Sequence, residues 1–188
     1  FLKMTLIKTS IGRRSFLKVT AAAGGGLMLG FNWFSSSDAA ASGILNSTSE
    51  SVGLNSYIKI GVDGIITLMS PNPEFGSNVK TSMPMILADE LDVDWKNVIV
   101  EQADFFPERF ERQFTGGSQG IRLGWKPLRT AGATARQMLI HAAAQTWNVS
   151  AGEITTDAGM LHHKQSGRKA GYGEMASLAA TLPVPKEV

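Results

Sequence analysis

The chain has no cysteine among its 188 residues. This absence excludes disulfide bonds, thiolate-bound metals and an iron–sulfur cluster held by the chain itself. It also has only three histidines, and no Ser/His/Asp arrangement with motif support is present. The formal net charge is only +2, and no basic run interleaved with aromatic residues follows Lys18. The composition therefore gives no reason to expect a nucleic-acid partner.

Most of the excess positive charge lies in the first 41 residues, which hold five cations against Asp38 and leave the rest near −2. There Gly12-Arg13-Arg14-Ser15-Phe16-Leu17-Lys18 precedes a glycine-diluted apolar run, residues 19–34. This order predicts a twin-arginine export signal, and Ala39-Ala40-Ala41 offers a cleavage site. An ordinary secretory signal or a basic helix on a membrane is the alternative, since the run is shorter than the roughly 20 residues of a spanning helix. We therefore expect a periplasmic protein, with membrane association left open.

The remaining 147 residues are enough for one domain with a real core. Residues 42–56 are rich in Ser, Gly and Asn and are predicted to be a linker, and residues 183–188 begin an exit linker. Between them, residues 57–62 and 65–69 flank Asp63-Gly64 and predict a hairpin. Residues 98–100 predict a buried strand, and residues 154–156 and 160–162 a second hairpin.

Helices are predicted for residues 79–91, from about 121 to 142, and for 173–182. Pro84 and Pro127 are expected in a first turn or at a kink. The long helix carries a narrow apolar stripe at steps of four and three residues: Ile121, Trp125, Leu128, Gly132, Ala135, Leu139 and Ala142. The order ββ-α-β-α-ββ-α predicts an α+β fold with mixed two-layer packing over residues 57–182.

Two glycine-bearing loops precede helices and are the best candidate sites. One is Glu74-Phe75-Gly76-Ser77-Asn78, and the other is Thr115-Gly116-Gly117-Ser118-Gln119. A helix start offers unpaired N–H groups and a partial positive charge, which suit a phosphate. Each loop taken alone is more often a plain helix cap. Their occurrence together, behind an export signal that cofactor proteins favour, supports a cofactor site.

Other candidate residues have weaker support. His162 and His163 are neighbours on a strand and so point to opposite faces, which predicts an exposed strand end rather than a metal site. His141 has no charge partner in sequence, and the acidic residues 89–94 indicate a solvated face. Glu74 and Glu101 could act as bases, but nothing in the sequence distinguishes them.

Several motifs resemble one family of enzymes. They are Gly61-Val62-Asp63-Gly64, Ser70-Pro71-Asn72-Pro73-Glu74-Phe75-Gly76, Lys80 to Ala88, Glu90-Leu91-Asp92-Val93-Asp94-Trp95, Gln113 to Ser118, Pro127-Leu128-Arg129 and Ala131-Gly132-Ala133. Residues 57–188 resemble the start of the large, molybdopterin-binding subunit of the xanthine dehydrogenase family. The nearest branch is that of isoquinoline 1-oxidoreductase beta subunits and periplasmic aldehyde dehydrogenases, whose members also open with a twin-arginine signal.

The resemblance implies an oxidoreductase that hydroxylates N-heterocycles or oxidises aldehydes at a molybdenum centre. It implies a molybdopterin cytosine dinucleotide as cofactor, [2Fe–2S] clusters on a small partner subunit and, as a further acceptor, a c-type cytochrome. It implies cofactor contacts at Phe75, Gly76, Ser77, Thr115, Gly116, Gly117 and Ser118. No catalytic residue is expected here, because the family's catalytic glutamate belongs to a region near the far C-terminus of a much longer subunit.

We therefore expect an N-terminal portion of such a subunit, which needs the remainder of the subunit for activity. One departure from the family is that Gly76-Ser77-Asn78 stands where Gly-Gln-Gly is usual. It keeps a second hypothesis open, in which the chain is a non-enzymatic exported relic or binding module that retains the fold without the cofactor.

Overall fold

The computed structural model describes residues 51–110 and 112–188 and confirms an α+β fold. The segment predicted as the export signal, residues 1–41, lies outside these residues. The predicted linker is wrong at its end, because Ser51–Asn55 form strand β1. Val52 pairs with Ile60 and the Leu54 side chain is buried. The Ser/Gly/Asn-rich composition hid this strand, since only two large apolar residues mark it.

A four-stranded sheet has the order β1-β2-β3-β4. Strands β2 (Ile58–Gly61) and β3 (Ile66–Ser70) form the predicted hairpin, and at its turn Gly64 adopts a positive φ of 83°. The Asp63 carboxylate accepts the backbone N–H of Ile65 at 3.0 Å and closes this turn. Strands β1, β2 and β3 are antiparallel, and β4 (Val98–Gln102) pairs parallel to β3.

The prediction that β4 is buried is wrong. Ile99 is 51% exposed, and no other strand of the described chain pairs with the outer edge of β4. The run Val98-Ile99-Val100 suggested a central strand because all three residues are apolar. At a sheet edge, with α2 against one face, only alternate residues are partly covered.

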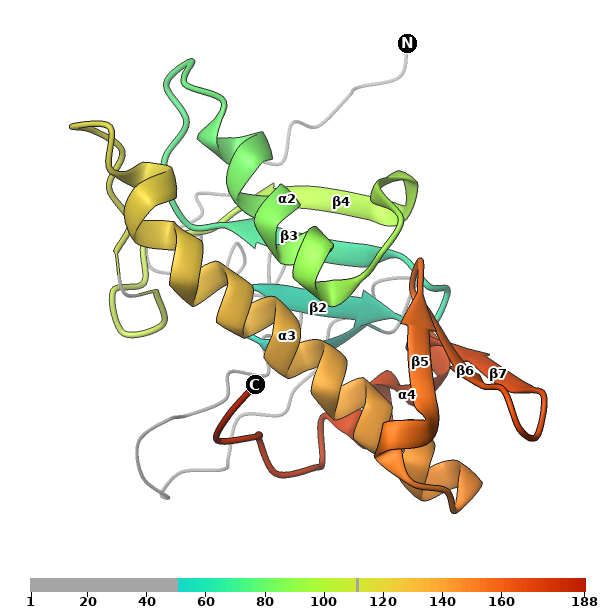
Figure 1. Cartoon of the computed structure of the whole chain (residues 1–188). Coiled ribbons are helices and arrows are strands. Elements are labelled where there is room, and N and C mark those ends of the chain that lie inside the picture. Colours follow the sequence, from blue (N-terminus) through green and yellow to red (C-terminus); the bar gives the residue numbers. More distant parts are fainter. Residues whose placement is uncertain (1–50, 111) are drawn as a thin grey trace, which may run out of the picture. The chain divides into compact units, whose positions relative to one another are not determined.

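Helices α2 (Val79–Leu91) and α3 (Gly120–Trp147) pack closely and run in the same direction, as Figure 1 shows. Glycines on α3 allow this approach. A Cβ added at Gly120 would touch Val79, one at Gly124 would meet Met83, and one at Gly132 would meet Leu87 and Glu90. Pro84 and Pro127 lie inside these helices, beyond the first turn.

The second sheet, β5-β6-β7, is antiparallel and carries one strand that was not predicted. β5 (Ile154–Asp157) and β6 (Met160–His163) form the expected hairpin, and β7 (Arg168–Gly171) adds a third strand with little apolar character. Helix α4 (Tyr172–Ala179) follows and packs against α3 and β2.

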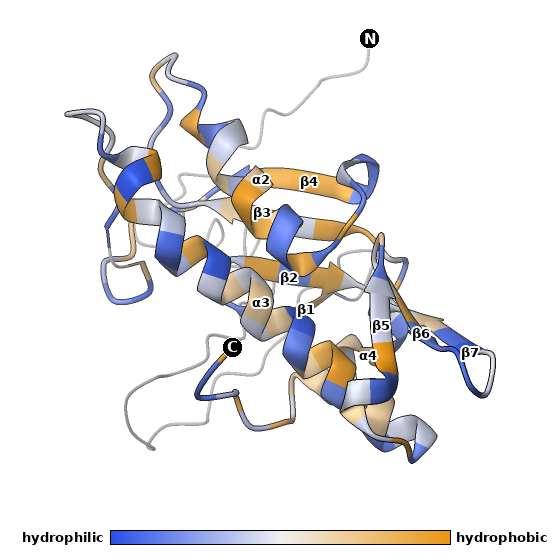
Figure 2. Ribbon diagram, viewed as in Figure 1, coloured by the Kyte–Doolittle hydropathy of each residue, from blue (hydrophilic) through white to orange (hydrophobic). Residues whose placement is uncertain are grey.

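Among the described residues, one main core joins the two sheets and helices α2, α3 and α4. Figure 2 shows β2, β3 and β4 as mostly hydrophobic beneath the mixed surface of α2 and α3. Within the described ranges, no helix has both the length and the apolar character to cross a membrane.

Candidate functional site

The two candidate loops converge at one end of the parallel pair β3 and β4. These strands end in register at Ser70 and Gln102, and the loops that leave them enter α2 and α3. Because both helices run in the same direction, their N-termini lie together with the loops (Figure 1). The crevice beyond the carboxyl ends of parallel strands is where open α/β sheets bind ligands.

Direct hydrogen bonds join the two segments at the points where they enter the two loops. The Asn72 side-chain amide donates to the carbonyl of Phe114 at 2.8 Å, and the Thr115 hydroxyl donates to the carbonyl of Pro73 at 2.6 Å. The structure thus brings together the two segments that the sequence singled out separately. Their role in binding a cofactor stays a prediction.

The long loop between β4 and α3 is held by Gln113 and by a small aromatic cluster. The Gln113 side chain accepts from the N–H of Phe106 at 2.7 Å and donates to the carbonyls of Asp104 at 2.7 Å and Pro71 at 3.2 Å. Phe110 is 1% exposed and meets the Tyr57 ring edge-on at 5.1 Å. The second candidate loop therefore starts from a well-anchored position.

Three backbone N–H groups at the first loop and the start of α2 are already hydrogen-bonded. The Glu74 carboxylate accepts the N–H groups of Gly76 at 2.5 Å, Asn78 at 3.0 Å and Lys80 at 3.0 Å. The N–H of Lys80, with smaller contributions from Gly76 and Asn78 and against an opposing effect of burial, lowers the pKa of Glu74 to about 2. A carboxylate bound in this way already supplies the negative charge that the start of α2 attracts.

While Glu74 accepts these three N–H groups, they are not available to a phosphate, and the predicted cofactor contacts of this loop stay a prediction. The lowered pKa also makes the Glu74 carboxylate a weak general base near neutral pH. The other candidate base, Glu101, pairs with Lys59 at 3.3 Å on the sheet. The spacing of Glu74 in the sequence did not mark this cap, because Glu74 stands four residues before the N-cap residue Asn78 and reaches the start of the helix only through the fold of the loop.

The second loop keeps its donors available. Gly117 and Ser118 both have positive φ, 58° and 56°, and Gln119 makes no side-chain cap. Among the described residues, the backbone N–H groups of Gly116, Gly117 and Ser118 have no hydrogen-bond acceptor. The first turn of α3 carries no acidic residue. These features suit an anionic group, since the orphan donors and the helix dipole both favour negative charge.

A cleft of about 310 Å³ opens beside this second loop. Asn72 and Arg112, which precede the two loops, line it together with Gln119 of the second loop, Gly120 and Leu123 of α3, and Met83 of α2. Residues 74–78 and 115–118 are not part of this lining. Asn72 is 3% exposed and its side-chain oxygen has no partner within residues 51–110 and 112–188. An unpaired buried polar atom beside a cleft indicates a missing partner. Asn72 and Arg112 were not predicted as site residues, although Asn72 stands in the Pro-Asn-Pro motif.

The predicted first-loop residues present side chains rather than backbone donors to solvent. Phe75 is 70% exposed, Ser77 is exposed, and Gly76 has a φ of 101°. On the second loop, Thr115 and Gly116 are half-buried, and the Phe114 ring would clash with a Cβ at Gly116.

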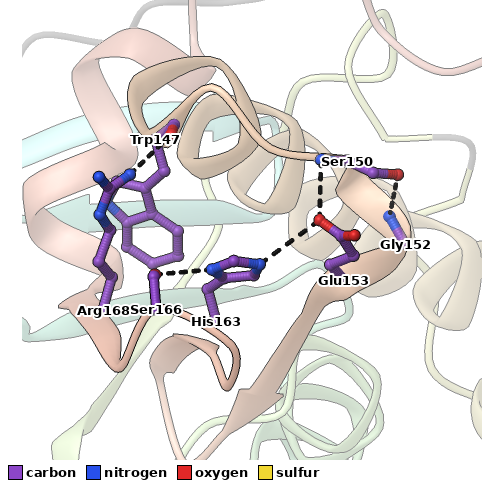
Figure 3. A network of polar contacts seen from close by, with 7 residues as sticks. All are labelled: Trp147, Ser150, Gly152, Glu153, His163, Ser166 and Arg168. Carbon is purple, nitrogen blue, oxygen red and sulfur yellow. Dashed lines mark hydrogen bonds and ion pairs between the residues drawn. The ribbon is translucent and has the colours of Figure 1, made fainter.

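The expectation of an exposed strand end at His162–His163 is wrong for His163, which is 4% exposed. Its Nδ1 lies 2.7 Å from the Ser166 hydroxyl, and its Nε2 lies 3.4 Å from the Glu153 carboxylate (Figure 3). Strand pairing brings Ile154 opposite His163 and so places the neighbouring Glu153 close by. The part of the chain that the structure describes contains no group of three His, Asp or Glu residues able to hold a metal ion.

Residues 21–187 match a family described as "Molybdopterin cofactor-binding domain", and the chain belongs to this family. It is 36% identical over 161 residues to isoquinoline 1-oxidoreductase subunit beta of Brevundimonas diminuta, covering 81% of this chain and 20% of that protein. It is 26% identical over 121 residues to a membrane-bound aldehyde dehydrogenase (pyrroloquinoline-quinone) of Gluconacetobacter polyoxogenes, covering 64% and 15%. The chain thus spans about a fifth or less of these relatives.

The fold is also found in solved molybdenum enzymes. Quinoline 2-oxidoreductase from Pseudomonas putida 86 superimposes with a TM-score of 0.52 at 17% identity, over 67% of this chain and 16% of that one. CO dehydrogenase from Oligotropha carboxidovorans gives 0.51 at 18% identity, over 68% and 18%. The resemblance to the xanthine dehydrogenase family is confirmed, and the chain is a molybdopterin-binding domain of a molybdenum hydroxylase family.

Proposed function

We propose that this chain is the N-terminal portion of the molybdenum-cofactor-binding subunit of an exported molybdenum hydroxylase, which oxidises aldehydes or N-heterocycles. The N–H groups of Gly116, Gly117 and Ser118, unpaired among the described residues, carry this proposal, because they stand directly before Gln119 and Gly120, which line the same cleft as Asn72 and its unpartnered oxygen. When bound, the cofactor would supply the molybdenum centre at which oxygen from water enters the substrate.

In this proposal, the backbone of Gly116, Gly117 and Ser118 holds a phosphate of the cofactor, and Arg112 adds positive charge. Gly117 and Ser118, both at positive φ, form a tight turn that the N–H of Gln119 closes onto the carbonyl of Gly116 at 3.2 Å, and the N–H groups of Gly116 to Ser118 are not used within this turn. The first loop contributes Phe75 and Ser77 through their exposed side chains, while Glu74 keeps the backbone of that loop in place.

The finer assignments rest on the resemblance. They are the cytosine dinucleotide form of molybdopterin, [2Fe–2S] clusters on a small partner subunit, a c-type cytochrome as electron acceptor, and export to the periplasm by the twin-arginine pathway. The absence of cysteine agrees with clusters on a partner, because iron–sulfur clusters are bound by cysteine thiolates.

The test is to produce the tagged chain with the proteins encoded beside it, in a host that makes the molybdenum cofactor. Molybdenum and iron per chain are measured by mass spectrometry, and the nucleotide released by acid is identified. We expect about one molybdenum per complex and cytidine monophosphate as the nucleotide. A pure, stoichiometric complex without molybdenum or pterin would overturn the proposal.

A matched pair of variants tests the second loop directly. Ser118→Asp places a negative charge at the start of α3, and Ser118→Asn is a neutral control of similar size. Both side chains tolerate the positive φ of this position. We expect the Asp variant to lose most of its molybdenum and the Asn variant to keep it, because an anion at the helix start repels a phosphate. Equal molybdenum content in the two variants would exclude this loop as the phosphate site.

One observation favours the second hypothesis, a binding module without cofactor. Glu74 occupies the donors of the first loop, and the family's glutamine side chain is replaced by the shorter Ser77. If this hypothesis holds, the complex purifies without molybdenum, and restoring Gln at position 77 by Ser77→Gln does not recover it.

A further inference from the structure

Three polar side chains lie in a row near the last turn of α3, at the opposite end of this helix from the second candidate loop (Figure 3). The Ser166 hydroxyl lies 2.7 Å from Nδ1 of His163, and Nε2 of the same ring lies 3.4 Å from the Glu153 carboxylate. Ser166 and Glu153 are exposed, whereas His163 is only 4% exposed. A hydroxyl beside an imidazole that a carboxylate orients is the arrangement that activates a serine as a nucleophile.

The pairing of β6 with β7 holds the serine against the histidine. His163 lies opposite Arg168 in the two strands, so the loop over residues 164–167 is short and brings the Ser166 hydroxyl back to the His163 ring. Arg168 also donates to the carbonyl of Trp147 at 2.7 Å and thereby ties the hairpin to the end of α3 (Figure 3). The fold therefore positions the serine and the imidazole before any ligand arrives, which is what a nucleophile and its base require.

The surroundings of the imidazole favour the tautomer in which His163 can accept the serine proton. A carboxylate can only accept a hydrogen bond, so Glu153 stabilises a proton on Nε2 and leaves the lone pair of Nδ1 facing Ser166. The Glu153 carboxylate is itself held by the N–H of Ser150 at 3.3 Å. Its contact with Nε2 has an ion-pair distance, and Nε2 has no hydrogen-bond partner in the described part of the chain. Contacts of this kind are often long without a substrate and tighten in the reacting complex.

We propose that Ser166 is a reactive nucleophile that takes an acyl group from small activated esters. Its Oγ forms a bond with the carbonyl carbon of the ester while Nδ1 of His163 takes the hydroxyl proton, and Glu153 stabilises the positive charge of the ring. The bond between that carbon and the leaving oxygen then breaks, and His163 passes the proton to the leaving alcohol or phenol. The N–H of Gly167, which has no acceptor among residues 51–110 and 112–188, can donate to the carbonyl oxygen as it becomes negative.

The position of the serine limits the class of ester. Ser166 lies in an exposed turn and does not line the cleft beside the second loop, so small esters are the expected acyl donors. None of the reacting groups belongs to the two candidate loops. This reactivity is therefore independent of the proposed function.

The experiment treats the full chain with p-nitrophenyl acetate and finds the acetylated side chains by peptide mass spectrometry. Ser150 is the internal control, because it is also exposed and lies beside the same glutamate. Its hydroxyl accepts the N–H of Gly152 at 3.3 Å and has no imidazole partner among the residues that the structure describes. We expect Ser166 to be acetylated at least about tenfold faster than Ser150, since general base catalysis contributes at least that much. The ratio of the two rates should fall from about pH 8 to about pH 5, where a histidine base becomes protonated.

A pair of variants separates base catalysis from plain exposure. Glu153→Gln keeps an oxygen for the N–H of Ser150 but removes the charge that stabilises the protonated ring, so it should slow acetylation of Ser166 at least about tenfold. Asp157→Asn neutralises an exposed carboxylate at the other end of β5 and should leave the rate unchanged. Both variants should keep the wild-type melting temperature. If Glu153→Gln lowers it, the ratio of Ser166 to Ser150 in the wild-type chain and its dependence on pH decide.

Equal acetylation of Ser166 and Ser150 would overturn the proposal, as would a rate at Ser166 that a folded Glu153→Gln variant leaves unchanged. Acetylation confined to the neighbouring Lys164 and Lys169 would also overturn it, because an amine needs no imidazole to react with this ester. A faster reaction at Ser166 that is lost both in Glu153→Gln and at low pH supports it.

Discussion

The contact between α2 and α3 positions both candidate loops, and two glycines of α3 allow a sharp test of it. A Cβ added at Gly132 would lie 2.8 Å from the carbonyl oxygen of Leu87 and 3.3 Å from the backbone N of Leu91. A Cβ added at Gly124 would also lie 2.8 Å from its neighbour, but that neighbour is the terminal methyl of Met83. Both glycines lie on α3, and an added Cβ would lie 2.8 Å from a neighbouring atom at each of them. The two positions differ in whether that neighbouring atom can move.

The magnitudes follow from two opposing effects. Replacing Gly by Ala inside a helix stabilises it by about 1 kcal/mol, while overpacking a closed core costs about 1–3 kcal/mol. At Gly132 the obstacle is backbone, so we expect Gly132→Ala to lower the free energy of unfolding by about 1 kcal/mol net. At Gly124 the methionine can change rotamer, so Gly124→Ala should raise it by up to about 1 kcal/mol. The variants should therefore differ by about 2 kcal/mol.

Urea unfolding of the full chain, followed by circular dichroism, measures this difference. Because about 1 kcal/mol shifts the melting temperature of a domain of this size by a few degrees, thermal melts give an independent reading. Equal stability of the two variants, within about 0.5 kcal/mol, would refute the reasoning that backbone contact at Gly132 sets the spacing of the helices.

Three further predictions concern single side chains. The pKa of Glu74 is about 2 in the folded chain, against 4.5 when unperturbed, so Glu74→Gln should destabilise the protein above pH 4.5. This loss of stability should shrink as the pH falls toward 2, because the wild-type carboxylate then becomes protonated too. The difference in unfolding free energy between wild type and variant, measured as a function of pH, checks this. His163→Ala should lower the free energy of unfolding by about 1–3 kcal/mol, because it removes a buried side chain. The same change at the half-buried neighbour, His162→Ala, should lower it by less than about 0.5 kcal/mol, and denaturant unfolding of the two variants compares them. Tyr172→Phe should cost about 1–2 kcal/mol in the same assay, since its hydroxyl donates to the carbonyl of Leu91 at 2.9 Å in the core. Burial also raises the pKa of Tyr172, so alkaline titration of the native chain should leave this tyrosine neutral above the usual range.

Local sequence patterns predicted helices and strands correctly where the spacing of apolar residues and the turn residues were distinctive. The Asp63-Gly64 hairpin, the helix over residues 79–91 and the long helix after Ser118 are all present. The two strands that were not predicted, β1 and β7, have few large apolar residues, and each pairs antiparallel with the strand next to it in the sequence, β2 and β6. Backbone pairing and packing against the rest of the fold stabilise such strands, so the residue types within them give little local signal.

The candidate site, too, was only partly predictable. The glycines before two helices were visible in the sequence, but the sequence did not show which helix start keeps unpaired N–H groups. Glu74 folds back onto the start of α2, while the start of α3 keeps its N–H groups unpaired among the described residues. A sequence pattern cannot separate the two cases, because a glutamate near a helix start is equally able to point into solvent.

By itself, the sequence determined the absence of thiolate chemistry, the α+β class and the two loops, because composition, periodicity and glycine placement are local properties. The tertiary structure decided that the two loops meet, since that depends on the parallel pairing of β3 with β4 and on the close approach of α2 and α3. It also decided which helix start keeps N–H groups unpaired among the described residues, and it left Ile121 and Trp125 of the long helix exposed. These outcomes depend on which surfaces pack against one another, and packing is settled only when the whole chain is folded.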